Sequence, residues 1–109
     1  MNKNRITIDI ELDENRLPEI IKWNSDINSG DFKISKAFFL SIFDKAEKDT
    51  LEIDLWTKDM QVIEMDRFVF QTINSLSDMY FRATKNSNLA NTMKNFAYFF
   101  GEETKIISK

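Results

Sequence analysis

The chain has 109 residues, of which 42% are hydrophobic and 30% are charged, and its formal net charge is −3. That balance is typical of one folded domain and not of a disordered chain, and it lacks the basic excess of nucleic-acid-binding proteins. Cys and His are both absent, which excludes disulfides and thiol chemistry and removes the commonest general base and metal ligand.

Two strands are predicted near the N-terminal end. Residues 5–12 alternate strictly between polar and apolar side chains, which is typical of a half-buried strand. Residues 13–18 indicate a turn, and residues 19–23 predict a second strand with Ile21 and Trp23 on one face. Because the loop between them is short, the two strands should pair antiparallel. A polar loop is expected after them, over residues 24–30.

The next two segments predict a helix and a third strand. Residues 33–48 carry Ile34, Phe38 and Ile42 at intervals of four, which favours a helix. Residues 51–56 place apolar side chains at every second position, which favours a strand. The third strand would therefore follow a helix that separates it from the first two strands.

The second half of the chain predicts two helices. Thr57 or Asp59 is the expected N-cap of the first, because either side chain can accept a hydrogen bond from an orphan backbone N–H. Apolar residues then recur at spacings of three and four to about Thr84. Residues 86–88 offer the cap of a last helix, which should end near Gly101.

The elements together follow the order β-β-α-β-α-α. This order predicts an α+β fold, with a small antiparallel three-stranded sheet and helices packed on one of its faces. Residues 1–109 are expected to form a single domain, since no linker or repeat interrupts them. No signal-peptide core and no run of about 20 apolar residues is found, so we expect a cytoplasmic protein without membrane insertion.

Four carboxylates raise the question of a cation site. Asp9 and Glu11 lie on the outward parity of the first strand, and Glu52 and Asp54 on that of the third. If the strands are neighbours, one sheet face holds all four, as a site for a hard cation or as a docking face for a basic partner. The alternative, which we favour, is a solvated face whose charges discourage edge aggregation. We therefore expect no metal and no other cofactor.

Enzymatic activity is not expected either. The chain has carboxylates, lysines and hydroxyls, but no His or Cys to act as a general base or nucleophile. Its two glycines, Gly30 and Gly101, are too far apart to form a phosphate-binding loop.

The residues most suited to binding a protein partner lie where the third strand meets the next helix. These are Trp56, Thr57, Lys58 and Asp59, an aromatic anchor beside polar groups. The alternative interpretation is structural, with Trp56 in the core and Asp59 as a helix cap. A chain of this size also gains stability from oligomerisation or from a partner, so a homo-oligomer stays open.

Several segments resemble the family of gliding motility-associated GldC proteins of Bacteroidetes. The most specific is Leu51-Glu52-Ile53-Asp54-Leu55-Trp56-Thr57-Lys58-Asp59-Met60, followed by Glu64-Met65-Asp66-x-Phe68-x-x-Gln71-Thr72. Residues 13–23 resemble the hairpin of the family, and residues 40–44 its first helix. Gln61 stands where the family is expected to prefer Pro, the usual first residue of a helix.

The resemblance implies a small soluble protein linked to gliding, and it offers no catalytic residues to carry over. We therefore expect a non-catalytic cytoplasmic accessory protein of gliding motility that acts through protein–protein contacts. Two alternatives remain: a chaperone-like adaptor of a secretion or motility system, and a domain that binds a small ligand or a metal.

Overall fold

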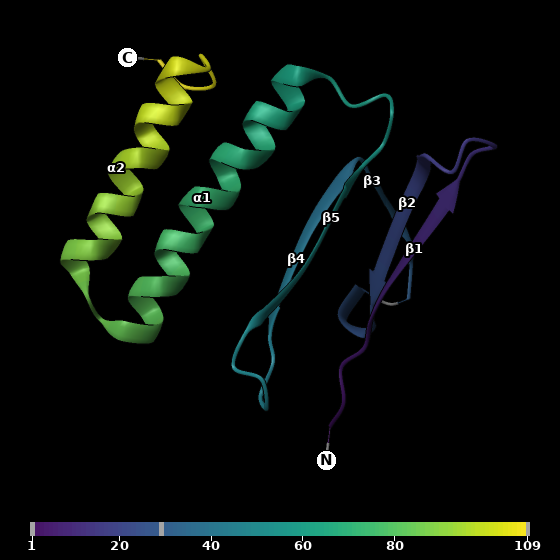
Figure 1. Ribbon diagram of the computed structural model, residues 1–109, viewed down its shortest axis with the longest axis horizontal. Helices are drawn as coiled ribbons and strands as arrows, with labels where there is room; N and C mark the ends of the chain where they lie inside the picture. The colour runs from purple at the N-terminus through teal and green to yellow at the C-terminus, as the bar shows by residue number, and fades with distance from the viewer. Residues whose placement is uncertain (1, 29, 109) are drawn as a thin grey trace. The chain divides into compact units, whose positions relative to one another are not determined.

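The computed structural model describes residues 2–28 and 30–108 and divides into two compact units, Met1–Met60 and Gln61–Lys109. The first unit contains all the strands, and the second is a pair of helices (Figure 1). The α+β class predicted from the sequence is confirmed.

The N-terminal hairpin follows the sequence prediction. Strand β1, Ile6–Leu12, pairs antiparallel with β2, Pro18–Ser25, and Ile8 lies opposite Trp23. A short 3-10 helix, Asp26–Asn28, occupies part of the expected polar loop. A third strand, β3 (Lys33–Ser35), then pairs antiparallel with β2 and completes a three-stranded sheet.

The helix predicted over residues 33–48 is wrong. Residues 33–43 are extended, as β3 and then β4 (Ala37–Phe43), and a turn follows at residues 44–49. The reason lies in the spacing of the apolar residues. Ile34, Phe38 and Ile42 are four apart, but they also share the even parity of a strand. Leu40 completes the alternation, and aromatic and β-branched residues favour an extended backbone.

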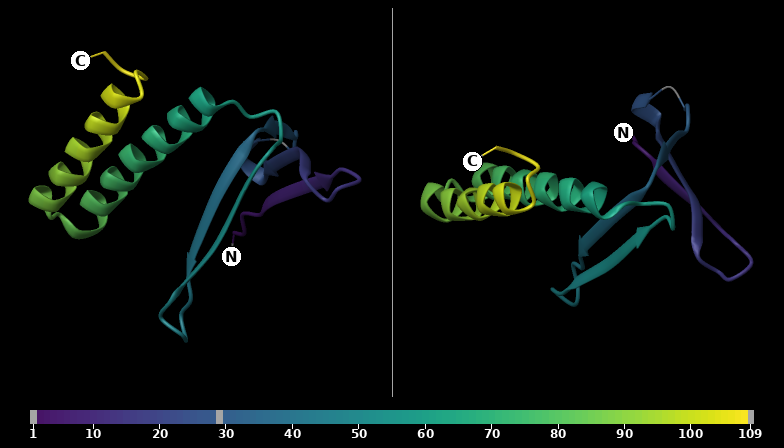
Figure 2. Two further views of the ribbon diagram at one scale, coloured as in Figure 1. Left: turned by 45° about the horizontal axis from the view of Figure 1, so that its top comes forward. Right: turned by 90° about the horizontal axis from the view of Figure 1, so that it is seen from above.

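Strand β4 pairs antiparallel with β5, Thr50–Trp56, in a second sheet of two strands. The single three-stranded sheet expected from the sequence is therefore replaced by two sheets. Lys36, between β3 and β4, is the point where the chain leaves the first sheet for the second. The loops of the two hairpins lie at separate ends of this unit (Figure 2).

One face of the β4–β5 hairpin is entirely apolar. The register places Phe38, Leu40 and Ile42 of β4 opposite three apolar residues of β5, and cross-strand neighbours share a face. We call this surface the hairpin face; it consists of Phe38, Leu40, Ile42, Leu51, Ile53 and Leu55. Most of its side chains are substantially exposed; Leu51, for example, is 65% exposed.

Both predicted C-terminal helices are present. Helix α1, Val62–Thr84, begins after Gln61 and not after the expected caps Thr57 or Asp59. The backbone N–H of Gln61 donates to Glu64 Oε1 at 2.9 Å, which satisfies a donor at the helix start. Helix α2, Ser87–Glu103, is capped as expected, because Asn86 Oδ1 accepts a hydrogen bond from the Leu89 N–H at 3.1 Å.

Small residues allow α1 and α2 to pack closely. Ala90, Ala97 and Gly101 of α2 and Ser77 of α1 are buried. The last helix ends at Glu103, close to the predicted end near Gly101, and Gly101 itself lies within the final turn, against Phe70 of α1. Within the described ranges, neither helix is both long and apolar enough to span a bilayer. The prediction that helices cover a sheet face concerns the placement of the two units, and it stays a prediction.

Candidate functional site

Residues 56–59, which we call the junction segment, are attached to two other parts of the first unit through the backbone. The N–H of Thr57 donates to the carbonyl oxygen of Lys36 at 2.7 Å, at the point where the chain changes sheets. The N–H of Lys58 donates to the carbonyl oxygen of Pro18 at 3.3 Å, at the start of β2. The junction segment is therefore positioned by residues that lie far from it in the sequence.

Asp13 orders the loop between β1 and β2. Its Oδ1 accepts hydrogen bonds from the backbone N–H groups of Asn15, at 2.8 Å, and Leu17, at 3.0 Å. Such bonds from a carboxylate to following N–H groups are the local interaction that stabilises Asx turns. Arg16 takes up the left-handed backbone conformation that this tight loop requires, with φ of 64°.

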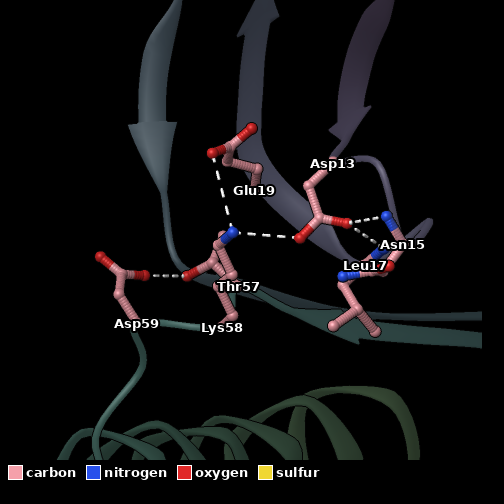
Figure 3. A network of polar contacts seen from close by, with 7 residues as sticks. All are labelled: Asp13, Asn15, Leu17, Glu19, Thr57, Lys58 and Asp59. Carbon is pink, nitrogen blue, oxygen red and sulfur yellow. Dashed lines mark hydrogen bonds and ion pairs between the residues drawn. The ribbon is translucent and has the colours of Figure 1, made fainter.

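The same carboxylate links the loop to the junction segment. Its second oxygen, Oδ2, accepts from Lys58 Nζ at 3.0 Å, and Glu19 Oε1 lies 3.8 Å from that nitrogen (Figure 3). The Asp13 side chain is only 13% exposed, whereas that of Lys58 is half exposed. Asp13 is thus the more buried partner of this ion pair, and Lys58 carries its positive charge at the surface.

The charges of this network reinforce one another. The backbone N–H of Leu17, and then Lys58, hold the pKa of Asp13 below its ordinary value. The hydrogen bond to Asp13 in turn raises the pKa of Lys58. A hydrogen bond from the Thr57 hydroxyl to Asp59 Oδ1, at 2.5 Å, lowers the pKa of Asp59. All three groups are therefore held in their charged forms at neutral pH.

The four residues of the junction segment take different roles in this arrangement. Thr57 is buried, at 3% exposure, so its hydroxyl positions Asp59 and cannot itself meet a partner. Trp56 is 53% exposed, and Lys58 and Asp59 are also exposed. Trp56 lines a hollow of about 380 Å³, whose other walls are Leu17, Pro18, Asp54, Leu55 and Lys58. An aromatic ring, an apolar hollow and a lysine thus adjoin on one surface.

The four carboxylates considered as a cation site are divided between the two sheets. Asp9 and Glu11 belong to β1, in the three-stranded sheet, whereas Glu52 and Asp54 belong to β5, in the other. Glu11 pairs with Lys22 at 3.1 Å. A hydrogen bond with Asp54 raises the pKa of Glu52. The cation site required these two strands to be neighbours, and they are not. Within residues 2–28 and 30–108, no group of three or more acidic side chains could hold a metal ion.

Sequence reasoning missed the contribution of the β1–β2 loop. Asp13, Leu17 and Pro18 were assigned only to a turn, yet they brace Lys58 and line the hollow beside Trp56. An Asp followed by polar residues and a Pro does indicate an ordered turn. No local pattern, however, indicates that the turn lies next to residues more than forty positions later in the chain.

Comparison with known proteins supports a family assignment. The family model described as gliding motility-associated protein GldC-like matches residues 18–106, a range that includes the junction segment and parts of both units. A search of curated proteins and a search of solved structures yield no match. The matched range covers most of the sequence, and it contains the most specific of the segments whose resemblance to GldC proteins was noted above, residues 51–72. The chain belongs to the GldC-like family of gliding motility-associated proteins.

Proposed function

We propose that this chain is a non-catalytic, cytoplasmic accessory protein of gliding motility, and that it acts by binding another protein through the junction segment. Family membership supports the association with gliding. The observation that carries the binding role is the exposure of Trp56 beside an apolar hollow. Tryptophan is among the residues most enriched at the centres of protein interfaces.

The rigid support of this surface favours recognition. Backbone hydrogen bonds to Lys36 and Pro18, together with the Lys58–Asp13 contact, hold the segment in one conformation before any partner arrives. A preformed surface loses less conformational entropy on binding than a mobile one. The partner expected here offers an apolar side chain for the hollow and an acceptor group for Lys58.

The absence of His and Cys from the sequence supports a non-catalytic role.

The test is a quantitative pull-down from gliding cells that carry this protein, with Trp56→Ala compared with wild type. Loss of an interface tryptophan should reduce recovery of the specific partner tenfold or more. Phe32→Ala is the matched control, because Phe32 is 47% exposed and lies outside the hollow. Gliding should fail with Trp56→Ala and persist with Phe32→Ala at equal protein levels. Equal recovery of the partner by both variants would contradict the assignment.

A further inference from the structure

Strand β4 has one edge that no strand occupies. All of its ladder partners belong to β5, from Ala37 opposite Trp56 to Phe43 opposite Thr50. Among the described residues, no backbone hydrogen bond joins the other edge of β4 to a further strand. A two-stranded hairpin alone is at best marginally stable in water, and a third strand or a packing surface is needed to stabilise it.

The hydrogen bonds at the two ends of the hairpin show which groups face that edge. Thr57 N–H donates to Lys36 O at 2.7 Å, and Asp44 N–H donates to Asp49 O at 2.8 Å. In an antiparallel ladder the residues alternate between hydrogen-bonded and non-hydrogen-bonded pairs. Even-numbered residues of β4 therefore bond to β5. The N–H and C=O groups of the odd-numbered residues point to the unpaired edge.

The unpaired edge carries none of the features that prevent an exposed strand edge from pairing with another chain. Strand β4 reads Ala-Phe-Phe-Leu-Ser-Ile-Phe, without a charge, a proline or a glycine. Phe39 is 52% exposed, Ile42 53% and Phe43 68%. An uncharged edge of this length is a template for pairing with another strand, and proteins that leave such an edge open aggregate.

The free edge of β5, on the side away from β4, differs from that of β4 because β5 carries two charged side chains, Glu52 and Asp54. Two copies of β5 paired about Ile53 would place Glu52 of one chain directly opposite Asp54 of the other. Like charges in directly opposed positions destabilise a strand pair. The two carboxylates already interact within one chain, where Asp54 raises the pKa of Glu52. Charge therefore protects the β5 edge and leaves the β4 edge as the one suited to pairing.

We propose that β4 pairs antiparallel with β4 of a second copy of this chain, about a two-fold axis through Leu40. In this register Leu40 lies opposite its own symmetry mate, and Phe38 opposite Ile42 of the second copy. Phe39 and Ser41 of the two chains exchange their outward backbone hydrogen bonds, as do Ala37 and Phe43. All seven residues of β4 are then paired.

Charge favours a second copy as the occupant, because the same register places Lys36 of each chain opposite Asp44 of the other, at the two ends of the strand pair. The chain is acidic, with a net charge of −3, so two copies repel each other wherever carboxylates meet. The uncharged β4 edge is a place where they approach without that repulsion. The product is a four-stranded sheet in the order β5-β4-β4-β5, whose outer edges carry Glu52 and Asp54. Pairing therefore ends at the dimer, and the two hairpin faces join into one apolar surface.

The first measurement is the mass of the full chain in solution, by light scattering or sedimentation. The expected mass is twice the 12.9 kDa of one chain. Ser41→Pro should shift the mass to that of a monomer, because it removes a hydrogen-bond donor that faces the unpaired edge. The same change spares the β5 ladder, so circular dichroism should show the strand content retained.

A cross-linking experiment tests the register. The chain has no cysteine of its own, so Leu40→Cys introduces a single thiol. Leu40 would face its mate in a non-hydrogen-bonded pair with Cα atoms about 4.5 Å apart, within the range that a disulfide spans. Mild oxidation should yield a covalent dimer that a reductant reverses.

Ile53→Cys is the matched control. Ile53 lies opposite Leu40 on the same face but in β5, and in the proposed sheet the two copies of residue 53 are three strand spacings, or about 14 Å, apart. It should form no disulfide.

The proposal fails if the full chain is a monomer at every concentration tested, or if Ile53→Cys cross-links and Leu40→Cys does not. Should Ser41→Pro fail to fold, the two cysteine variants still decide the register. The result is also separable from that for the proposed function, since Trp56→Ala should leave the dimer mass unchanged. A β4 edge that captures another protein instead of a second copy would appear as a monomer in the purified state, which rejects the dimer.

Discussion

At the scale of single residues, Asp13 organises the candidate site. One of its oxygens orders the β1–β2 loop, and the other holds Lys58 of the junction segment. The sequence correctly indicated a turn at this position, because Asp and Asn side chains stabilise turns through local hydrogen bonds. It could not indicate the contact with Lys58, which depends on how the two hairpins meet.

Asp13→Asn should change how stability depends on pH. The pKa of Asp13 lies below its unfolded value of 3.8, so the folded protein binds this proton less readily than the unfolded chain does. The stabilisation is present above the unfolded pKa and is lost as pH falls through the folded pKa. The variant lacks this titration, so its unfolding free energy should fall less steeply than that of wild type below about pH 5.

Urea titrations across this pH range measure the effect. Glu14→Gln removes an equal charge from the same loop and serves as the control. If the unfolding free energy of Asp13→Asn falls with pH in parallel with that of wild type, Asp13 contributes nothing to the acid sensitivity of the fold.

At the scale of elements, the main error concerned residues 33–48. Side chains spaced four apart fit a helix face, but the same spacing is a multiple of two and fits a strand face equally well. What decided between them is pairing, because β3 has a partner in β2 and β4 a partner in β5. A single sequence does not display such partners. Segments with one clear period, such as 62–84, were predicted correctly.

Gly101→Ala tests the close packing of α1 and α2. In an open helix this change gains about 0.5–1 kcal/mol. Here the new Cβ would lie 2.8 Å from Phe70 Cε1 and 3.0 Å from Ile107 Cγ1, so the ring must move. Overpacking of this kind costs typically about 1–3 kcal/mol, so we expect a net loss of roughly 1 kcal/mol.

Urea unfolding followed by helical circular dichroism measures this loss. Asn95→Ala, at an exposed position of the same helix, should be neutral or slightly stabilising because alanine has the higher helix propensity. A Gly101→Ala variant more stable than wild type would show that the helices have room to separate.

At the scale of the whole molecule, few apolar side chains are buried. Within the described ranges, Ile21, Ala90 and Ala97 form the buried apolar set, whereas Phe43 and Leu51 are 68% and 65% exposed. Burial of apolar surface is the main favourable term in folding. Pairing of the β4 edge, as in the dimer proposed above, is therefore expected to add stability that the isolated chain lacks.

The melting temperature should accordingly rise with protein concentration. Association stabilises the folded state by mass action, and for a chain of this size each tenfold increase in concentration should add roughly a few degrees. Scanning calorimetry over a hundredfold range measures this, and Ser41→Pro should show no such dependence. A constant melting temperature for wild type would contradict self-association.

The sequence by itself determined the α+β class, the first hairpin, β5, both helices, and the cap at Asn86, because each depends on a local period or a local hydrogen bond. It also contained the segments that mark the GldC-like family. Tertiary structure alone decided that residues 33–43 are extended and change sheets at Lys36. It also separated the carboxylates of β1 from those of β5 and placed Asp13 beside Lys58. These features depend on contacts between residues far apart in the chain, which local periodicity does not record.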